Sequence, residues 1–304
     1  MPTKNPQTIK QEIVVVIDKS GSMSNCRDDV IGGFNTYIAD LKKDKSIDAK
    51  LTLVMFDDYV HKLYSGKDID QVGELCTRTY SPNGSTALND AVMEAIDDVE
   101  TRLKKSKAKN KPQVLVIVFT DGEENRSQKF KNKDDVKAKR GEKESEGWAF
   151  IFMGADMDAW AAGHSYGMSA GNTIGIGKQA IASGAQYLAN RTRKAATMHR
   201  GLISGDMCGS VYAESMSSLM TLDADDLAND QEAVTLRNAI DTSSQIKAPG
   251  ANATQQLQGL LNTQPLIPTQ WVPPTNPAYA DLMKKAAEAI KPTAKTEKDK
   301  TKTP

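Results

Sequence analysis

Three short stretches of the sequence carry oxygen side chains at spacings that suit the binding of a cation. Asp18, Ser20 and Ser22 alternate along the first stretch, directly after an apolar run. Thr86 lies in the second stretch, Ser-Pro-Asn-Gly-Ser-Thr, and Asp121 lies in the third, Thr-Asp-Gly-Glu-Glu-Asn. Because alternate residues of an extended segment turn to the same side, the first three side chains can share one ligand. Hard oxygen ligands of this kind favour Mg²⁺, with Mn²⁺ and Ca²⁺ as alternatives.

The elements that must position these residues can be read from the hydrophobic pattern. Short, continuous, β-branched runs predict strands buried on both faces, and amphipathic segments between them predict helices. The expected strands are residues 12–17, 49–56, 60–64, 114–119, 148–153 and 172–176, and the expected helices cover residues 30–41, 86–103 and 179–199. This alternation predicts a doubly wound α/β fold, in which a mostly parallel central sheet carries helices on both faces. Ligands of such sheets bind beyond the carboxyl ends of the strands, where the three stretches fall.

The domain organisation follows from a change of composition. We expect the α/β domain to cover residues 1–204, and residues 205–304 to form a polar, low-complexity extension that is partly helical and partly disordered. Residues 223–237 and 279–290 are the expected helices of this extension. The segment around Cys208 can be either a last helix packed on the domain or the start of the extension.

The composition limits the kinds of partner that the protein is expected to bind. The 39 basic and 39 acidic residues balance, so no bulk charge points to nucleic acid or to a membrane surface. The basic run at residues 102–111 has no interleaved aromatic residues and is interpreted as a solvated helix end. Three well-separated cysteines, a polar start and the lack of a long apolar run predict a cytoplasmic protein.

The three stretches together resemble a known family. Asp-Lys-Ser-Gly-Ser-Met, Gly-Ser-Thr-Ala-Leu-Asn-Asp-Ala-Val and Phe-Thr-Asp-Gly-Glu-Glu-Asn, in this order, resemble the segments of a von Willebrand factor A (VWA) domain that form its metal-ion-dependent adhesion site. The resemblance covers roughly residues 10–200. It implies a Rossmann-like fold and a magnesium site formed by five residues of this chain: Asp18, Ser20, Ser22, Thr86 and Asp121. The flanking segments are most similar to stand-alone cytosolic bacterial and phage members.

The expected function is divalent-metal-dependent protein binding. With only two carboxylates among the five ligands, we expect the metal to take one more anionic oxygen from a Glu or Asp of a partner protein. The resemblance implies an adaptor or cofactor of a larger protein machine, with an AAA+ ATPase as one candidate partner. The alternative is a structural component of an assembly such as a phage particle, attached through the site or through the Pro-rich stretch at residues 271–277, in which case the virion is the location.

Other interpretations of the same residues remain open at this point. Turn and helix-capping chemistry could explain Asp18, Thr86 and Asp121 without a metal. Asp90 could support the site indirectly, and Glu123 and Glu124 are expected to be solvated. A magnesium-dependent hydrolase is the rival class, but the position two residues after Asp18 is Ser20, which cannot act as a general acid near neutral pH. We therefore expect no enzymatic activity.

Overall fold

A computed structural model describes residues 8–105 and 111–221 of the 304-residue chain. The chain divides into two units, Met1–Ala248 and Pro249–Pro304, and every described residue belongs to the first. The helices expected at residues 223–237 and 279–290 lie outside the described residues.

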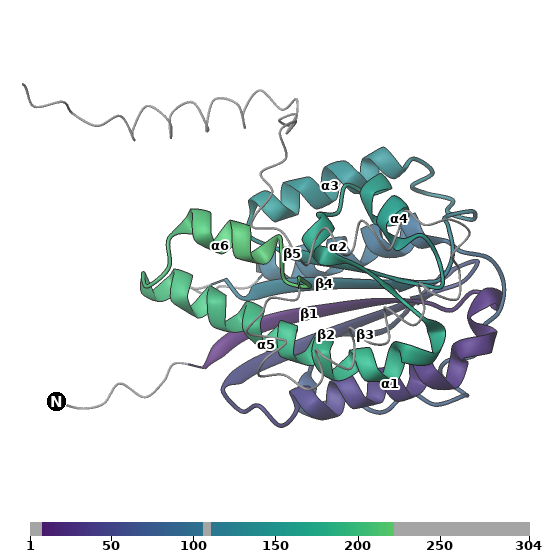
Figure 1. The fold of residues 1–304 in the computed structure, drawn as a ribbon, viewed down its shortest axis with the longest axis horizontal. Helices are drawn as coiled ribbons and strands as arrows, with labels where there is room; N and C mark the ends of the chain where they lie inside the picture. Colours follow the sequence, from purple (N-terminus) through teal and green to yellow (C-terminus); the bar gives the residue numbers. More distant parts are fainter. Residues whose placement is uncertain (1–7, 106–110, 222–304) are drawn as a thin grey trace, which may run out of the picture. The chain divides into compact units, whose positions relative to one another are not determined.

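A six-stranded sheet forms the centre of the first unit (Figure 1). The strand order is β3-β2-β1-β4-β5-β6, and all neighbours pair in parallel except β2 and β3, which form an antiparallel hairpin. This arrangement confirms the predicted mostly parallel sheet. The strands are β1 (Ile9–Asp18), β2 (Ile47–Phe56), β3 (Val60–Asp68), β4 (Gln113–Thr120), β5 (Ala149–Ala155) and β6 (Thr173–Ile176).

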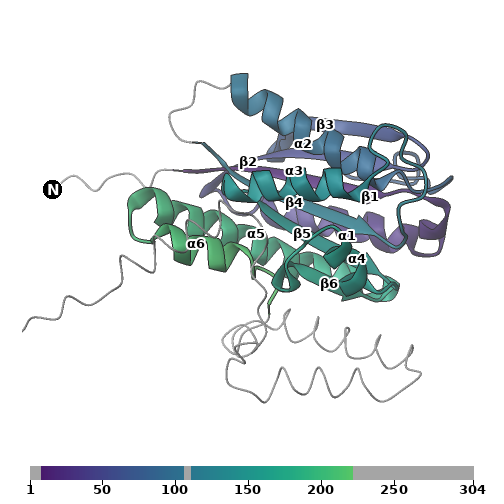
Figure 2. The same cartoon turned by 90° about the horizontal axis from the view of Figure 1, so that it is seen from above.

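Helices cover both faces of the sheet (Figures 1 and 2). One face carries α2 (Leu88–Lys105), α3 (Lys133–Ser145) and α4 (Ala159–Ser165), and the other carries α1 (Arg27–Leu41), α5 (Ile181–Ser204) and α6 (Gly209–Met216). Short 3₁₀ turns complete the order: η1 (Gly21–Cys26), η2 (Ile69–Gln71), η3 (Ala170–Asn172) and η4 (Lys178–Ala180). Among the described residues, no helix is long and apolar enough to span a bilayer.

The central strand β1 is apolar without a break from Ile13 to Ile17, because both of its faces are buried there. Ile13, Val15 and Ile17 belong to the core beneath α1 and α5, whereas Val14 and Val16 belong to the core beneath α2. Successive side chains of a strand point to opposite faces, so a strand between two helical layers needs apolar residues at every position. The polar residues of β1 lie at its two ends, with Lys10, Gln11 and Glu12 before this apolar run and Asp18 after it.

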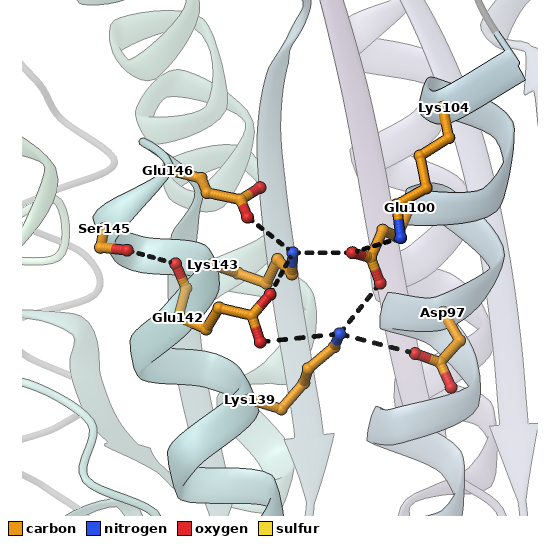
Figure 3. A network of polar contacts seen from close by, with 8 residues as sticks. All are labelled: Asp97, Glu100, Lys104, Lys139, Glu142, Lys143, Ser145 and Glu146. Carbon is orange, nitrogen blue, oxygen red and sulfur yellow. Dashed lines mark hydrogen bonds and ion pairs between the residues drawn. The ribbon is translucent and has the colours of Figure 1, made fainter.

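The charged segment before β5 forms a helix that the hydrophobic pattern did not predict. Its helix α3 presents Lys143, whose side chain is 1% exposed, to three carboxylates. The Lys143 ammonium lies 2.9 Å from Glu100 of α2 and 2.8 Å from both Glu142 and Glu146, while Lys139 bridges to Glu100 at 2.9 Å (Figure 3). Paired charges thus join α2 and α3 in addition to the buried Val136, which belongs to the same apolar core as α2.

Packing continues beyond residue 204, where the sequence pattern placed the end of the domain. Gly205, with φ of 83°, ends α5 in the left-handed conformation, and α6 then packs back on α5. The side chain of Asn172 donates to Met216 O at 2.7 Å and accepts from Leu219 N at 2.8 Å. The segment around Cys208 therefore forms a last helix that packs on the domain, which is one of the two interpretations that its sequence allowed.

Candidate metal site at the carboxyl edge of the sheet

Asp18 is the last residue of β1 and is fully buried. Its Oδ1 accepts from the backbone N–H of Ser20 at 2.7 Å, and its Oδ2 accepts from the hydroxyl of Thr120, the last residue of β4, at 2.6 Å. The backbone carbonyl of Asp18 accepts from the hydroxyl of Tyr80 at 2.7 Å. Both carboxylate oxygens are thus held in place, one by the loop that follows β1 and one by the end of the adjacent strand β4.

A chain of short oxygen contacts joins the first stretch to the third. The hydroxyls of Ser20 and Ser22 lie 3.0 Å apart, and Ser22 Oγ donates to Asp121 Oδ1 at 2.6 Å. β1 and β4 are parallel neighbours, so their carboxyl ends deliver Ser22 and Asp121 to the same edge. The structure therefore brings four of the five expected ligands together.

Thr86, the fifth, is positioned mainly through its backbone. Its N–H donates to Asn125 Oδ1 at 2.9 Å, and its carbonyl accepts from Asn125 N at 3.1 Å. A Cβ built on Gly122 would lie 3.5 Å from Thr86 Oγ1, which places this hydroxyl against the residue that follows Asp121. The second stretch is also bound to the first, since Gly21 N donates to Gly84 O at 3.0 Å.

The site combines the buried carboxylate of Asp18 with the ammonium of Lys178, which lies beside Asp121. Burial raises the pKa of the Asp18 carboxyl, against the opposing hydrogen bonds from Thr120 and Ser20. The ammonium of Lys178 lies 2.6 Å from Asp121 Oδ2, and it donates to Ser22 O at 3.2 Å. Burial lowers the pKa of Lys178, but the contact with Asp121 outweighs this and leaves the pKa above its usual value.

The residues present fit a divalent cation of the hard class. The converging atoms are carboxylate and hydroxyl oxygens, which such ions prefer. The described residues contain no group of three or more His, Cys, Asp or Glu side chains that could hold a metal ion, so a site here depends on the serine and threonine hydroxyls as well as on the two carboxylates. The position of the Lys178 ammonium shows in addition that a positive charge is accommodated between Asp121 and Ser22.

Sequence reasoning missed three residues of the site. Thr120 could have been found, because it precedes Asp121 at the end of the most apolar strand. Tyr80 lies in a loop that carries no local signal, and its hydroxyl reaches Asp18 only because that loop folds under the end of β1. Lys178 follows β6 in the η4 turn, and nothing in the pattern around it marks it as part of the site.

The acidic residues considered as neighbours of the site have structural roles. Asp90 accepts from the backbone N–H groups of Gln128 at 2.8 Å and Phe130 at 2.8 Å, so it fixes the loop before α3. Glu124 was expected to be solvated but is half-buried, and it accepts from Asn89 N and Ser127 N at 2.7 Å each. Glu123 is exposed, as expected.

One further sequence pattern is typical of the nucleophilic serine of α/β-hydrolases. Residues 163–167 read Gly-His-Ser-Tyr-Gly, the pattern of a nucleophile elbow, in which the serine occupies a sharp turn from a strand into a helix. Here Ser165 is the last residue of α4, and its hydroxyl donates to Ala162 O at 2.7 Å. This serine therefore does not occupy an elbow.

The family follows from a comparison with known domains. The von Willebrand factor type A domain model matches residues 12–165, which is half of the chain. The chain belongs to the VWA family. Domains of this family commonly hold a metal ion at a metal-ion-dependent adhesion site and mediate protein interactions or adhesion, and most of its members are not enzymes.

Several solved structures are similar to this chain at low sequence identity. Proximal thread matrix protein 1 from the mussel byssus is 18% identical, with 60% of this chain and 45% of that chain covered and a TM-score of 0.43. The domain of the pili tip protein Mfa5 from Porphyromonas gingivalis is 12% identical (62% and 97% covered, TM-score 0.47). The manganese-loaded TRAP protein of Plasmodium vivax is 17% identical (59% and 72% covered, TM-score 0.42). The match thus spans less than half of the mussel protein, and no protein of curated function matches the sequence.

Proposed function

We propose that this VWA domain is a divalent-metal-dependent protein-binding module whose metal site takes an acidic side chain from a partner protein. The observation that carries the proposal is the chain of contacts from Asp18 through Ser20 and Ser22 to Asp121, which gathers oxygen ligands from two parallel strands at one sheet edge. When bound there, Mg²⁺ would supply a Lewis-acidic centre with a free position for a carboxylate.

The protein supplies the ligand geometry. Thr120 and the backbone of Ser20 fix the Asp18 carboxylate, so its orientation is set by the chain itself. Asp18 and Ser20 are buried while Ser22 is exposed, which leaves the ligand set open to solvent on one side. A partner side chain can reach the site from that side.

The surroundings of the site suit a docking face. A pocket of about 210 Å³ adjoins Asp121 between the loop 121–124 and α4. Tyr59, 69% exposed, follows the carboxyl end of β2, and Trp160, 55% exposed, follows that of β5. Because β1 and β4 lie between β2 and β5, these two aromatic side chains flank the site. Exposed Tyr and Trp are the residue types that most often anchor protein interfaces.

The role we propose in the cell is that of an adaptor in a larger protein machine in the cytoplasm. An AAA+ ATPase or a component of an assembled particle are the candidate partners, and both would present a Glu or Asp to the metal. Capture by the full chain that requires Mg²⁺ and is abolished by EDTA would support either partner once it is identified.

The deciding experiment is a calorimetric titration of the chelator-treated full chain with Mg²⁺ and Mn²⁺. Two variants, Asp18→Asn and Ser22→Ala, test the site. Asp18→Asn keeps the size of the buried side chain and Ser22 is exposed, so both variants should lose metal binding and keep the fold. Asp70→Asn is the matched control, because it also removes one carboxylate charge. Asp70 is exposed, lies in η2 and pairs with Lys45. Equal metal binding by Asp18→Asn and the parent chain would show that the proposed site is wrong.

A further inference from the structure

The site contains a cation that belongs to the chain itself. Lys178 is not part of any of the three stretches, and it enters from the η4 turn between β6 and α5. Its ammonium contacts Asp121 Oδ2 at 2.6 Å and Ser22 O at 3.2 Å, so two of its three donors point at groups of the proposed metal site. The side chain is 20% exposed and that of Asp121 is 2% exposed, so water screens this pair only weakly.

Lys178 changes the charge that the site presents. The carboxylates of Asp18 and Asp121 carry two negative charges, which by themselves would neutralise a divalent cation. The ammonium of Lys178 cancels one of them, so the loaded site would keep one positive charge and would attract an anion.

Other charged groups near the site do not undo this effect. Lys19 is paired with Asp57 at 2.5 Å, so its charge is already balanced. Asp156 accepts from the backbone N–H of Lys178 at 3.4 Å, but it is exposed and its charge is screened by water. Glu123 is likewise exposed.

We propose that Lys178 determines what this site binds: its positive charge weakens the affinity for the divalent cation and strengthens the affinity of the loaded site for a carboxylate. This inference rests on the proposed metal site. Two positive charges beside the nearly buried carboxylate of Asp121 repel each other, so removing the ammonium should tighten divalent binding by roughly tenfold. The same ammonium attracts an incoming carboxylate, so its removal should weaken carboxylate binding by a comparable factor, roughly tenfold.

The test compares the full chain with its Lys178→Met and Lys178→Arg variants after chelator treatment. Titration with Mn²⁺, followed by electron paramagnetic resonance of the free ion, gives the metal affinity. Acetate is then added to the Mn²⁺-loaded protein, and the fall in water-proton relaxation reports displacement of a metal-bound water by the carboxylate. Lys178→Met should bind Mn²⁺ about tenfold more tightly and should need about tenfold more acetate, while Lys178→Arg keeps the positive charge and should stay closer to the parent than Lys178→Met in both measurements.

Lys45→Met is the matched control, because it also removes one positive charge but from an exposed pair with Asp70 before β2. Lys178→Gln provides a second neutral variant, and circular dichroism checks that each variant is folded. If the parent binds Mn²⁺ and both neutral variants bind it equally well, the inference about Lys178 is wrong and the proposed function stands. Tighter Mn²⁺ binding with unchanged acetate binding also overturns the inference. If neither the parent nor any variant binds Mn²⁺, the proposed function fails and the inference fails with it.

Discussion

The hydroxyl of Thr120 donates to Oδ2 of Asp18 over 2.6 Å, linking the last residues of two parallel strands. The same Thr120 oxygen accepts from the backbone N–H of Gly122 at 3.1 Å, which ties the loop that carries Asp121 to the end of β4. One buried threonine thus fixes one proposed ligand directly and the loop of another. These contacts suit a role in positioning the proposed ligands.

Replacing Thr120 tests this positioning role. Thr120→Val has nearly the same shape but leaves Asp18 Oδ2 without its donor, so we expect divalent affinity to fall by about 10–100-fold. Thr120→Ser keeps the hydroxyl and should retain most of the parent affinity. Calorimetric titration with Mg²⁺ measures both. An equal loss in the two variants would indicate a packing effect and contradict the role of the hydroxyl.

Replacing Asp90 should lower the stability of the protein without changing its affinity for metal. Its carboxylate holds three consecutive backbone N–H groups, from Gln128 to Phe130, and its removal would leave them without an acceptor. We expect Asp90→Ala to lower the free energy of unfolding by roughly 2–3 kcal/mol. Its metal affinity should stay within about twofold of the parent, since the structure gives it no contact with the site residues. Urea denaturation and the metal titration together check this, and a large loss of affinity in a folded variant would give Asp90 a part in the site.

Two neighbouring glycines of α1 should respond oppositely to alanine. A Cβ at Gly32 would meet nothing within 4 Å, so Gly32→Ala should stabilise the protein by about 0.5–1 kcal/mol through the lower entropy of the unfolded chain. A Cβ at Gly33 would lie 3.1 Å from Ile181 Cγ2 and 3.4 Å from its carbonyl, at the close approach of α1 and α5. Gly33→Ala should therefore be less stable than Gly32→Ala, and chemical denaturation of the pair measures the difference. Equal stabilisation would show that α1 and α5 can separate freely.

The network between α2 and α3 should make stability depend on pH. Hydrogen bonds from Lys139, Lys143 and Lys104 lower the pKa of Glu100 from 4.5 to about 2. A carboxyl with a lowered pKa in the folded state contributes stability above its unfolded pKa, and this contribution is lost as pH falls from about 4.5 towards about 2.

Glu100→Gln removes this titration. At neutral pH we expect the variant to be less stable than the parent by roughly 1–3 kcal/mol, and the difference should shrink as the pH falls through the acid range. Urea denaturation at several pH values from neutral down to about pH 3 measures the difference. Glu74→Gln, at an exposed position, is the matched control. A difference that stays constant with pH would show that the contacts of Glu100 do not depend on its charge.

The sequence by itself determined the sheet and the identity of the proposed ligands. The unbroken apolar runs of β1 and β4 could only be strands between two helical layers, because both faces of each had to be buried. The order of the three stretches then assigned Asp18, Ser20, Ser22, Thr86 and Asp121 to one edge, and the structure joins all of these except Thr86 by a chain of hydrogen bonds. These features are local, so their periodicity and spacing are visible along the chain.

Only the tertiary structure decided the surroundings of that site. The helix α3 has few apolar residues and is held by charge pairs with α2, so hydrophobic periodicity could not reveal it. Tyr80 and Lys178 reach the site from loops far from the three stretches, and their contacts depend on how the chain folds back. Long-range contacts leave no period in the sequence, and this is why the charge that Lys178 brings to the site became apparent only in the folded protein.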